Sequence, residues 1–411
     1  MGILNWGFRS NIKLHQKEDS INLKSNDGDI KFTDFTKKLT LIDPTKKLWL
    51  NPLLFNGSLQ TLYYTSMDSS KKFQVYYGRE TFKYKDGGTC SLDWVIPKHE
   101  NFKQLYQETL PQDSPRLHPR TRFLSKEELS QLYSKETETP IVVICHGLAG
   151  GSHESLIRNL AENIERNCDS WDRVVINNRG CCRTKLTSGT LFNAGSTNDI
   201  REVLQKFKKT WPNRPIYLCG FSFGGALVTN FLGEEGDSGL VKAACAVGCP
   251  FDFVDSAYHI QSSLTGKYLL SPALTQFLSK IVFNNKKEIM EHSDLINDEK
   301  LAKLKTIKNT YEFDQLITCK TTPYANAFEY YRELSPLRQI LNIKTPFMMI
   351  NSTDDPAVGV NLPIIDINTN PYLLLVETDL GGHLGYVKSN GDFWCVEVVE
   401  QFFQKFQELI K

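Results

Sequence analysis

Leu218-Cys-Gly-Phe-Ser-Phe-Gly-Gly-Ala226 contains one serine, with a glycine two positions before it and another two positions after it. The apolar run Pro215-Ile-Tyr-Leu-Cys219 leads into this stretch and predicts a buried strand. After the serine, residues 225–232 place apolar side chains at helical spacing. A strand, a tight turn and a helix with serine at the apex form the context in which a Gly-x-Ser-x-Gly motif indicates a nucleophile. Such a turn strains the backbone and needs small neighbours, which Gly220 and Gly224 provide.

The same pattern has a second interpretation, a glycine-rich turn in which Ser222 only caps the helix that follows. A serine hydroxyl is a poor nucleophile, so catalysis also requires a base that removes its proton and an acid that orients the base. A base and an acid in loops after other predicted strands would therefore favour the nucleophile over the helix cap.

The rest of the chain alternates between strand and helix patterns. Helical patterns lie between most of the strand-like runs, for example at residues 155–166, 197–210 and 224–234. This alternation predicts an α/β fold with a mainly parallel central sheet, covered by helices on both faces. The other strand-like runs are Ile141-Val-Val-Ile-Cys145, Val174-Val-Ile-Asn177, Ala243-Ala-Cys-Ala-Val-Gly-Cys249, Pro346-Phe-Met-Met-Ile350 and Tyr372-Leu-Leu-Leu-Val376.

The domain organisation follows from where this alternation begins and where it is interrupted. We expect the α/β domain to cover residues 61–411, with an early antiparallel hairpin made of Glu80-Thr-Phe-Lys-Tyr84 and Cys90-Ser-Leu-Asp-Trp-Val-Ile96. Residues 254–341 interrupt the alternation with helical patterns and a proline turn. An insertion there would lie over the carboxyl ends of the strands, where α/β sheets bind ligands. We interpret it as a helical cap or lid, inserted before the last strands.

Residues 1–60 have no regular pattern, and we expect a partly irregular N-terminal arm. Its first 14 residues mix apolar side chains, Trp6 and Phe8 among them, with Arg9 and Lys13. Such a segment can lie on a membrane surface, or it can be an extended arm packed on the body of the protein. Residues 24–47 are polar and charged, which favours a mobile linker.

Candidate partners for Ser222 stand in loops after the last two predicted strands. His383, in Asp379-Leu-Gly-Gly-His-Leu-Gly385, is the candidate general base, and the alternative is a surface histidine in a glycine-rich turn. Asp354 and Asp355 follow the preceding strand, and one of them is expected to accept the imidazole N–H. The pattern Asp-Pro-x-Val slightly favours Asp355 for this role, but the sequence alone does not decide between the two aspartates. The order serine, aspartate, histidine is that of the α/β-hydrolase fold.

Acyl transfer by a serine also needs an oxyanion hole, which backbone N–H groups usually form. The residue after the nucleophile, Phe223, supplies one candidate donor. The loop His146-Gly-Leu-Ala-Gly-Gly-Ser152 follows another predicted strand and supplies the second, which we place at Leu148. His146 and His153 lie near this loop, and we expect them to have structural roles.

Composition excludes several other classes of function. The net charge is +1, so nothing suggests a nucleic-acid partner. No run approaches the ~18 apolar residues of a transmembrane helix, and the first residues lack the apolar core of a secretory signal, so we expect a protein that is not secreted. The 10 cysteines have no disulfide or zinc spacing, which predicts reduced thiols in a reducing compartment. We expect a cytoplasmic protein without a metal or a cofactor, and the apolar N-terminal residues leave peripheral association with lipid droplets or organelle membranes open.

Together these motifs resemble the fourth family of α/β-hydrolases, and within it the yeast medium-chain fatty acid ethyl ester synthase/esterases. The residues that carry the resemblance are His146-Gly-Leu-Ala-Gly-Gly-Ser-His-Glu154, Asn177-Asn-Arg-Gly180, Gly220-Phe-Ser-Phe-Gly-Gly225, Asp354-Asp-Pro356 and Gly381-Gly-His383. It extends from about residue 73 to the C-terminus. The resemblance implies Ser222 as nucleophile, His383 as base and Asp354 or Asp355 as the third member of a triad.

The resemblance also implies what the enzyme acts on. Members of the family form an acyl-enzyme from acyl-CoA and transfer a medium-chain acyl group to ethanol or another small alcohol, or they hydrolyse medium-chain esters. Relatives act on monoacylglycerol, so a monoacylglycerol lipase or general carboxylesterase is the alternative. A remoter alternative is a binding protein with this fold that has lost its activity.

Overall fold

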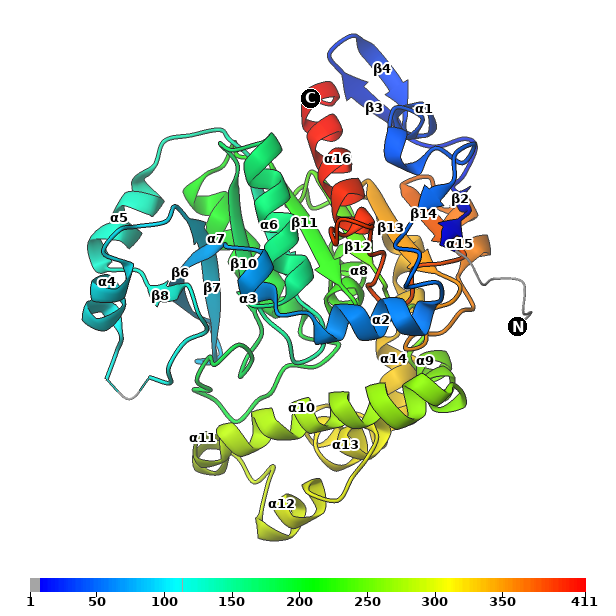
Figure 1. The fold of residues 1–411 in the computed structure, drawn as a ribbon. Helices are drawn as coiled ribbons and strands as arrows, with labels where there is room; N and C mark the ends of the chain where they lie inside the picture. Colours follow the sequence, from blue (N-terminus) through cyan, green and yellow to red (C-terminus); the bar gives the residue numbers. More distant parts are fainter. Residues whose placement is uncertain (1–7, 113) are drawn as a thin grey trace.

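The computed structural model describes residues 8–112 and 114–411, which form one large twisted sheet with helices packed on both of its faces (Figure 1). From one edge to the other the strands are β2 (Ile12–His15), β14 (Leu373–Thr378), β13 (Phe347–Ser352), β12 (Ala243–Val247), β11 (Ile216–Phe221), β9 (Ile141–Cys145), β10 (Asp172–Asn177), β7 (Thr89–Ile96), β6 (Tyr76–Lys83) and β8 (Thr121–Phe123).

The middle of the sheet is parallel, as the sequence predicts. Strands β14, β13, β12, β11, β9 and β10 run in the same direction, each paired with the next. Every residue of β9 and β11 is buried, which explains why these strands appear as continuous apolar runs. The predicted hairpin is β6 with β7, paired antiparallel. The expected α/β fold with a mainly parallel sheet is therefore confirmed.

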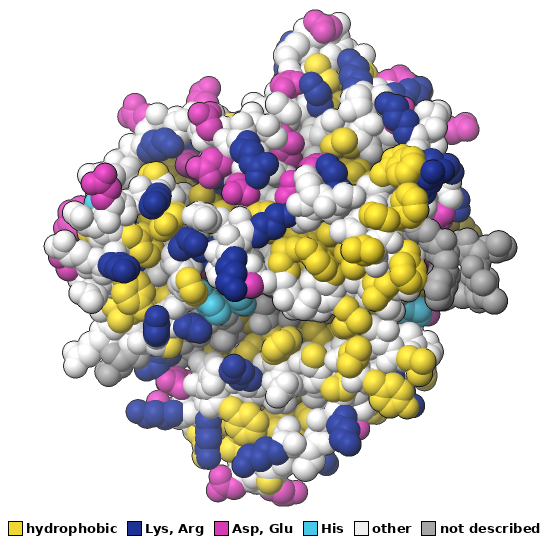
Figure 2. All heavy atoms as spheres, viewed as in Figure 1, with side chains coloured by type: hydrophobic (Ala, Val, Ile, Leu, Met, Phe, Trp, Pro, Cys, Tyr) yellow, Lys and Arg dark blue, Asp and Glu magenta, His cyan; other side chains and the backbone are white. Residues whose placement is uncertain are grey.

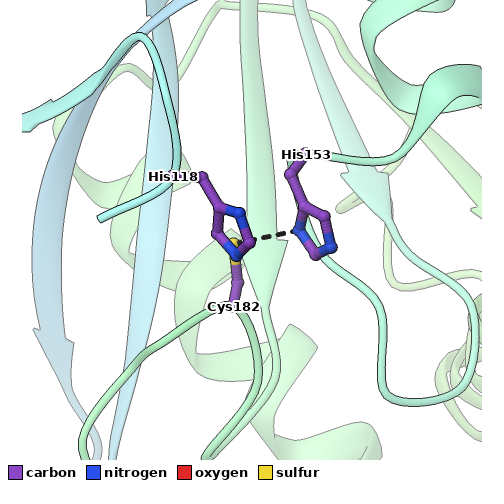
Figure 3. A group of neighbouring side chains, drawn as sticks. All are labelled: His118, His153 and Cys182. Atoms are coloured by element: carbon purple, nitrogen blue, oxygen red, sulfur yellow. Dashed lines mark hydrogen bonds between the residues drawn. The ribbon is translucent and has the colours of Figure 1, made fainter. Parts of the chain in front are cut away.

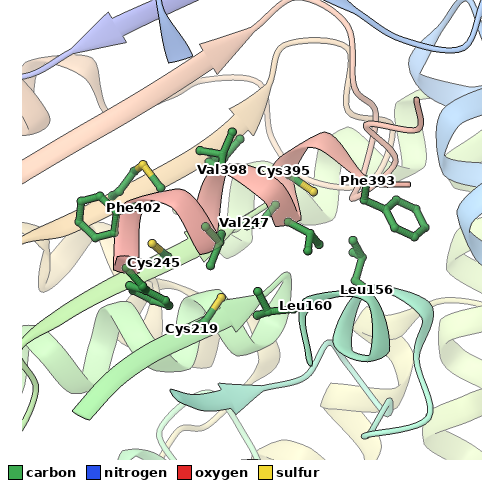
Figure 4. Packing of buried hydrophobic residues seen from close by; sticks show 14 of the residues in the cluster. Leu156, Leu160, Cys219, Cys245, Val247, Phe393, Cys395, Val398 and Phe402 are labelled. Atoms are coloured by element: carbon green, nitrogen blue, oxygen red, sulfur yellow. The ribbon is translucent and has the colours of Figure 1, made fainter. Parts of the chain in front are cut away.

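Helices cover the two faces of the sheet in separate layers. On one face, α6 (Ser155–Asn167) and α16 (Trp394–Leu409) pack on each other and on alternate strand residues such as Cys219 and Cys245 (Figure 4). On the other face, α7 (Thr197–Thr210), α8 (Phe223–Glu235) and α15 (Ile364–Thr369) pack on the intervening residues, such as Ile141 and Val143.

The chain between β12 and β13 forms a helical layer beyond the carboxyl ends of the parallel strands (Figure 1). We call this layer the cap; it has an apolar core of its own, which includes Leu278, Val282 and Phe313. It consists of α9 (Phe253–Ser262), the π-helical turn η3 (Gly266–Leu270), α10 (Ser271–Asn284), α11 (Lys286–His292), α12 (Asp298–Leu304), α13 (Thr310–Leu316) and α14 (Ala327–Leu334). The cap helices extend from Phe253 to Leu334, and the insertion expected from the sequence is residues 254–341.

The N-terminal segment is more ordered than its composition suggests. Strand β2 is the edge strand of the main sheet, paired antiparallel with β14, so the sheet is not confined to residues after 61. Residues 24–47 do not form a linker, because Phe32 and Phe35 are fully buried against Phe402 and Phe406 of α16. The elements of this segment are β1 (Arg9–Ser10), β3 (Asn22–Ser25), β4 (Gly28–Lys31), α1 (Phe32–Thr36), β5 (Leu48–Trp49) and α2 (Gly57–Ser66).

The sequence left two interpretations of the first 14 residues, a membrane-surface segment and a packed arm. Residues 8–14 fit the packed arm, because they pair with β5 and β14 of the protein. Trp6 and the other residues of 1–7 lie outside the described part of the chain. Over residues 8–112 and 114–411, no helix combines the length and the hydropathy of a membrane span. The remaining helices are α3 (Ser69–Lys72), α4 (Phe102–Thr109) and α5 (Lys126–Ser134).

Candidate active site

Ser222 lies at the apex of the sharp turn between β11 and α8, as the sequence predicts. Its φ of 52° and ψ of −119° are strained for a residue with a side chain. Its backbone N–H donates to Val247 O at 2.8 Å, which holds the turn against the neighbouring strand β12. A Cβ at Gly220 would lie 2.3 Å from Gly224 O, and one at Gly224 would lie 2.3 Å from Cys145 O, so both positions require glycine.

Three side chains from three loops form a continuous series of hydrogen bonds. Ser222 Oγ lies 2.8 Å from His383 Nε2, and His383 Nδ1 lies 2.8 Å from Asp355 Oδ2. These residues follow β11, β14 and β13, whose carboxyl ends lie at the same edge of the sheet. Asp355 is buried, and its Oδ1 accepts from the backbone N–H groups of Ala357 and Val358 at 2.7 and 3.0 Å. The carboxylate is therefore fixed in the orientation that holds the imidazole.

Asp354 accepts hydrogen bonds from backbone N–H groups and a hydroxyl, whereas Asp355 accepts from the imidazole of His383. Its Oδ1 accepts from the backbone N–H groups of Gly381 and Gly382 at 3.1 and 2.8 Å, and from the Ser352 hydroxyl at 2.6 Å. It thus supports the backbone of the loop that carries His383 without contacting the imidazole. Burial raises the pKa of Asp354 to about 6.

The predicted oxyanion loop, residues 146–152, lies beside Ser222. Leu148 and Phe223 both line the cavity that contains Ser222 and His383. His146 braces the loop: its buried ring donates from Nδ1 to Gly147 O at 2.7 Å and accepts from the Asn178 N–H at Nε2, 3.1 Å away. Burial lowers the pKa of His146, which favours this neutral form. His146 therefore has the structural place that the sequence suggests.

The cavity in front of Ser222 has a volume of about 720 Å³ and is bounded by the sheet loops, by α2 and by the cap. Most of its lining is aliphatic or aromatic, with Leu274, Leu278 and Ile281 of α10 along one side. Leu269 and Phe277 belong to the lining yet are about half exposed, so the cavity opens to the surface beside them. The site can therefore hold an extended apolar group with a reactive carbonyl at Ser222.

Several residues that hold the site in place were not predicted from the sequence. Thr61 Oγ1 accepts from the His383 backbone N–H at 2.8 Å, so α2 supports the loop of the candidate base. Glu154 accepts from the Gly151 N–H at 2.9 Å and from the Tyr64 hydroxyl at 3.1 Å, and so supports the oxyanion loop. The contact of Thr61 with His383 joins residues 322 positions apart, and that of Glu154 with Tyr64 joins residues 90 positions apart, so local sequence does not reveal either contact.

One half-buried carboxylate in the cap also faces the cavity. Asp314, in α13, lines the cavity and accepts from the hydroxyls of Thr318 and Tyr331, each at 2.6 Å. Burial raises the pKa of Asp314 to about 6, although both hydroxyl groups act to lower it. It is a polar group in an otherwise largely apolar wall.

Comparison with known proteins agrees with this architecture. The family model described as the alpha/beta hydrolase fold matches residues 140–389. A medium-chain fatty acid ethyl ester synthase/esterase of Saccharomyces cerevisiae is 38% identical, with 98% of this chain and 97% of the relative covered. A monoacylglycerol lipase of the same yeast is 37% identical over 87% of this chain and 80% of its own length.

Among solved structures, an esterase of Pyrococcus furiosus is 13% identical and covers 82% of this chain and 94% of its own, with a TM-score of 0.46. The match of the family model and the extent of the yeast relatives establish the family, and the expected resemblance is confirmed. The chain belongs to the alpha/beta hydrolase fold family, as an enzyme of its esterase and hydrolase class.

Proposed function

We propose that the protein is a serine acyltransferase and esterase, which transfers medium-chain acyl groups from acyl-CoA to ethanol and hydrolyses medium-chain esters. The observation that carries the proposal is the hydrogen-bonded series of Ser222, His383 and Asp355 in the wall of a largely apolar cavity. The yeast relative at 38% identity is named for both synthesis and hydrolysis of such esters.

The proposed reaction proceeds through an acyl-enzyme. Ser222 Oγ attacks the thioester or ester carbonyl while His383 Nε2 takes its proton, and Asp355 stabilises the imidazolium. The N–H groups of Leu148 and Phe223 donate to the oxyanion, and His383 then protonates the leaving thiol or alcohol. In the second half, His383 deprotonates an alcohol or a water molecule, which attacks the acyl carbonyl; the bond to Ser222 Oγ then breaks, His383 returns the proton to Oγ, and the ester or acid is released. Acyl-CoA enters as a substrate, and the mechanism uses no resident cofactor.

The shape of the cavity supports a medium-length acyl chain. At about 720 Å³ it falls within the roughly 300–1,000 Å³ of typical small-molecule sites. Its walls offer aliphatic contacts along α10, which stabilise methylene groups at roughly 0.8 kcal/mol each. An apolar wall also lowers the activity of water near the acyl-enzyme, which favours attack by an alcohol.

The experiment that tests this proposal follows ethyl octanoate and free octanoate together, from octanoyl-CoA and ethanol. Wild type, Ser222→Ala and His383→Ala are compared. Ester formation that disappears in both variants supports an alcohol acyltransferase that uses the proposed residues. Free acid as the only product means that the protein is a hydrolase and that the synthase activity is absent.

A second candidate function, monoacylglycerol hydrolysis, is favoured by Asp314. A carboxylate that accepts from two hydroxyls can also accept from a glycerol hydroxyl, which ethyl esters lack. If this is its role, Asp314→Asn lowers kcat/KM for 1-octanoylglycerol more than for ethyl octanoate. An equal decrease for the two esters assigns Asp314 to the structure of the cap and removes this argument.

Peripheral association with a lipid surface is a further part of the proposal. Tyr268, Leu269 and Phe277 are exposed where the cavity opens, and Figure 2 shows hydrophobic side chains gathered over this face of the molecule. A double change, Leu269→Ser with Phe277→Ser, is expected to reduce flotation with phosphatidylcholine vesicles. Unchanged flotation, or none in the wild type, contradicts association through this surface.

A further inference from the structure

Three potential metal ligands lie together outside the candidate triad: His118, His153 and Cys182 (Figure 3). His118 comes from the segment before β8, His153 from the end of the oxyanion loop, and Cys182 from the loop after β10. Their ligand atoms all lie within 4.8 Å of one another. The spacing of the cysteines did not predict a zinc site, because the three residues are far apart in the sequence and only the fold brings them together.

The distance between two of the ligand atoms fits a tetrahedral ion. Cys182 Sγ lies 3.6 Å from His153 Nδ1. Zinc binds thiolate sulfur at about 2.3 Å and imidazole nitrogen at about 2.0–2.1 Å, and a tetrahedral angle then separates the two ligand atoms by about 3.6 Å. An ion can therefore bridge these atoms without moving either loop.

The side chains around the sulfur favour its thiolate form, which is the form that binds metals. Arg79 Nη2 donates to the sulfur at 3.4 Å. Its guanidinium is already paired with the buried Asp93 through two bonds of 2.7 and 2.8 Å, so its charge is compensated when a cation binds nearby.

The ring of His118 is the third potential ligand group. In the structure it stacks on His153, with ring centroids 3.9 Å apart and planes 1° from parallel. Because ligand lone pairs lie in the ring plane, one ring must turn about its Cβ–Cγ bond to share an ion with the other. No hydrogen bond of the His118 ring to the described residues opposes this turn.

We propose that His118, His153 and Cys182 form a zinc site with a fourth position open to solvent. Two imidazoles and a thiolate are a donor set suited to zinc, and three protein ligands leave room for water or an added anion. The site borders the oxyanion loop: a Cβ at Gly151 would lie 2.7 Å from Cys182 Sγ. Zinc binding thus fixes the end of the loop that carries Leu148, through His153, and is a means of modulating the enzyme.

The test uses Co²⁺ as a spectroscopic substitute for zinc in the full-length protein. A thiolate-to-cobalt charge-transfer band is expected in the wild type and absent in Cys182→Ser. Replacement of His118 by alanine is expected to weaken binding at least tenfold, measured by Zn²⁺ competition with a chromophoric chelator. Cys181→Ser, which changes the adjacent buried cysteine, and His292→Ala, which changes an exposed histidine in the cap, serve as controls with unchanged binding.

Two outcomes would overturn the proposal. One is a wild-type protein that gives no charge-transfer band at cobalt concentrations well above that of the protein. The other is a band, or a zinc affinity, that His118→Ala leaves unchanged, which would assign the metal to other residues. Since His118 is half-buried and its ring only stacks, His118→Ala is expected to fold, so it remains informative even if Cys182→Ser does not.

Discussion

The adjacent residues Asp354 and Asp355 have the same side chain and contact different groups. Asp355 holds the His383 ring at 2.8 Å, whereas Asp354 accepts from the backbone N–H groups of Gly381 and Gly382. An asparagine can replace the acceptor role of Asp354, because its carbonyl oxygen accepts from the same donors. It cannot replace Asp355 as well, since it does not stabilise the imidazolium and can hold the wrong tautomer.

This contrast gives a paired prediction. Asp355→Asn is expected to lower kcat by about four orders of magnitude, as the equivalent change does in serine proteases, with little effect on KM. In Asp354→Asn the activity is expected to stay within about tenfold of the wild type. Hydrolysis of p-nitrophenyl octanoate measures both, with circular dichroism as a check on folding. Equal losses in the two variants would contradict the assignment of separate roles.

Asp354 also predicts how stability depends on pH. Its pKa is about 6 in the folded protein, above the usual 3.8, because burial disfavours the charged form. Between pH 4 and 6 the unfolded chain therefore loses this proton while the folded protein keeps it, so stability falls as pH rises. The raised pKa of Asp354 is expected to lower the free energy of unfolding by about 3 kcal/mol over this pH range.

In Asp354→Asn this contribution is absent. The free energy of unfolding in urea, measured at several pH values, is expected to decrease more between pH 4 and 6 for the wild type than for the variant. Parallel curves for the two proteins would show that Asp354 does not retain a proton in the folded state.

At the residue scale, the sequence indicated Ser222, His383 and an aspartate pair, since each stands in a loop directly after a predicted strand. It could not choose between the aspartates, because the choice depends on which carboxylate faces the ring. It also missed the contacts of Thr61 with His383 and of Glu154 with Tyr64, which join residues far apart in the chain.

At the scale of elements, α1 connects the N-terminal segment to the last helix. Phe35 is fully buried, with its ring 5.8 Å from that of Phe402 and 5.3 Å from that of Phe406, both edge-on. These contacts bury apolar surface of α16, which itself covers the sheet. The N-terminal segment is therefore part of the core and not an appendage of it.

Phe35→Ala is accordingly expected to lower the free energy of unfolding by about 3–5 kcal/mol, measured by urea denaturation. Leu53→Ala is the matched control from the same segment, because Leu53 is 78% exposed and its loss should change stability by less than about 0.5 kcal/mol. A small effect of Phe35→Ala, similar to that of the control, would mean that this segment contributes little to the fold.

The elements that the sequence predicted best are the six parallel strands, because nearly all of their residues are buried and each contains a continuous apolar run. The N-terminal elements were not predicted, for a physical reason. Phe32 and Phe35 stand among charged residues, and the helix that buries them lies more than 350 residues later in the chain. The residues near Phe32 and Phe35 in the sequence therefore do not indicate that these side chains are buried.

At the scale of the whole molecule, the cap and the sheet together define the cavity. Both parts line the cavity: α10 of the cap forms one side, and the loops after β9, β11 and β14 form the other. The sequence predicts a cap from the break in the alternation of strands and helices. It could not give the size of the cavity, which depends on how the cap helices lie over the sheet.

The size of the cavity predicts the effect of filling it. Ala273, on α10, lines the cavity, and Ala273→Trp is expected to lower kcat/KM for octanoyl esters about tenfold or more while butyryl esters are less affected. Ala302→Trp, at an exposed position of α12 away from the lining, is the control. A series of p-nitrophenyl esters measures the preference. A uniform decrease for all chain lengths would place the acyl group elsewhere.

The pairing of β2 with β14 has a consequence for how the protein is made. His15 pairs with Leu375, so a strand that leaves the ribosome early must wait for about 360 further residues. At roughly 5–20 residues per second, the wait is about 20–70 seconds. During synthesis that edge of the sheet has no partner, and the loop of His383 does not yet exist. The candidate active site is therefore incomplete until the loop of His383 has been made, and β2 has no β14 partner before then.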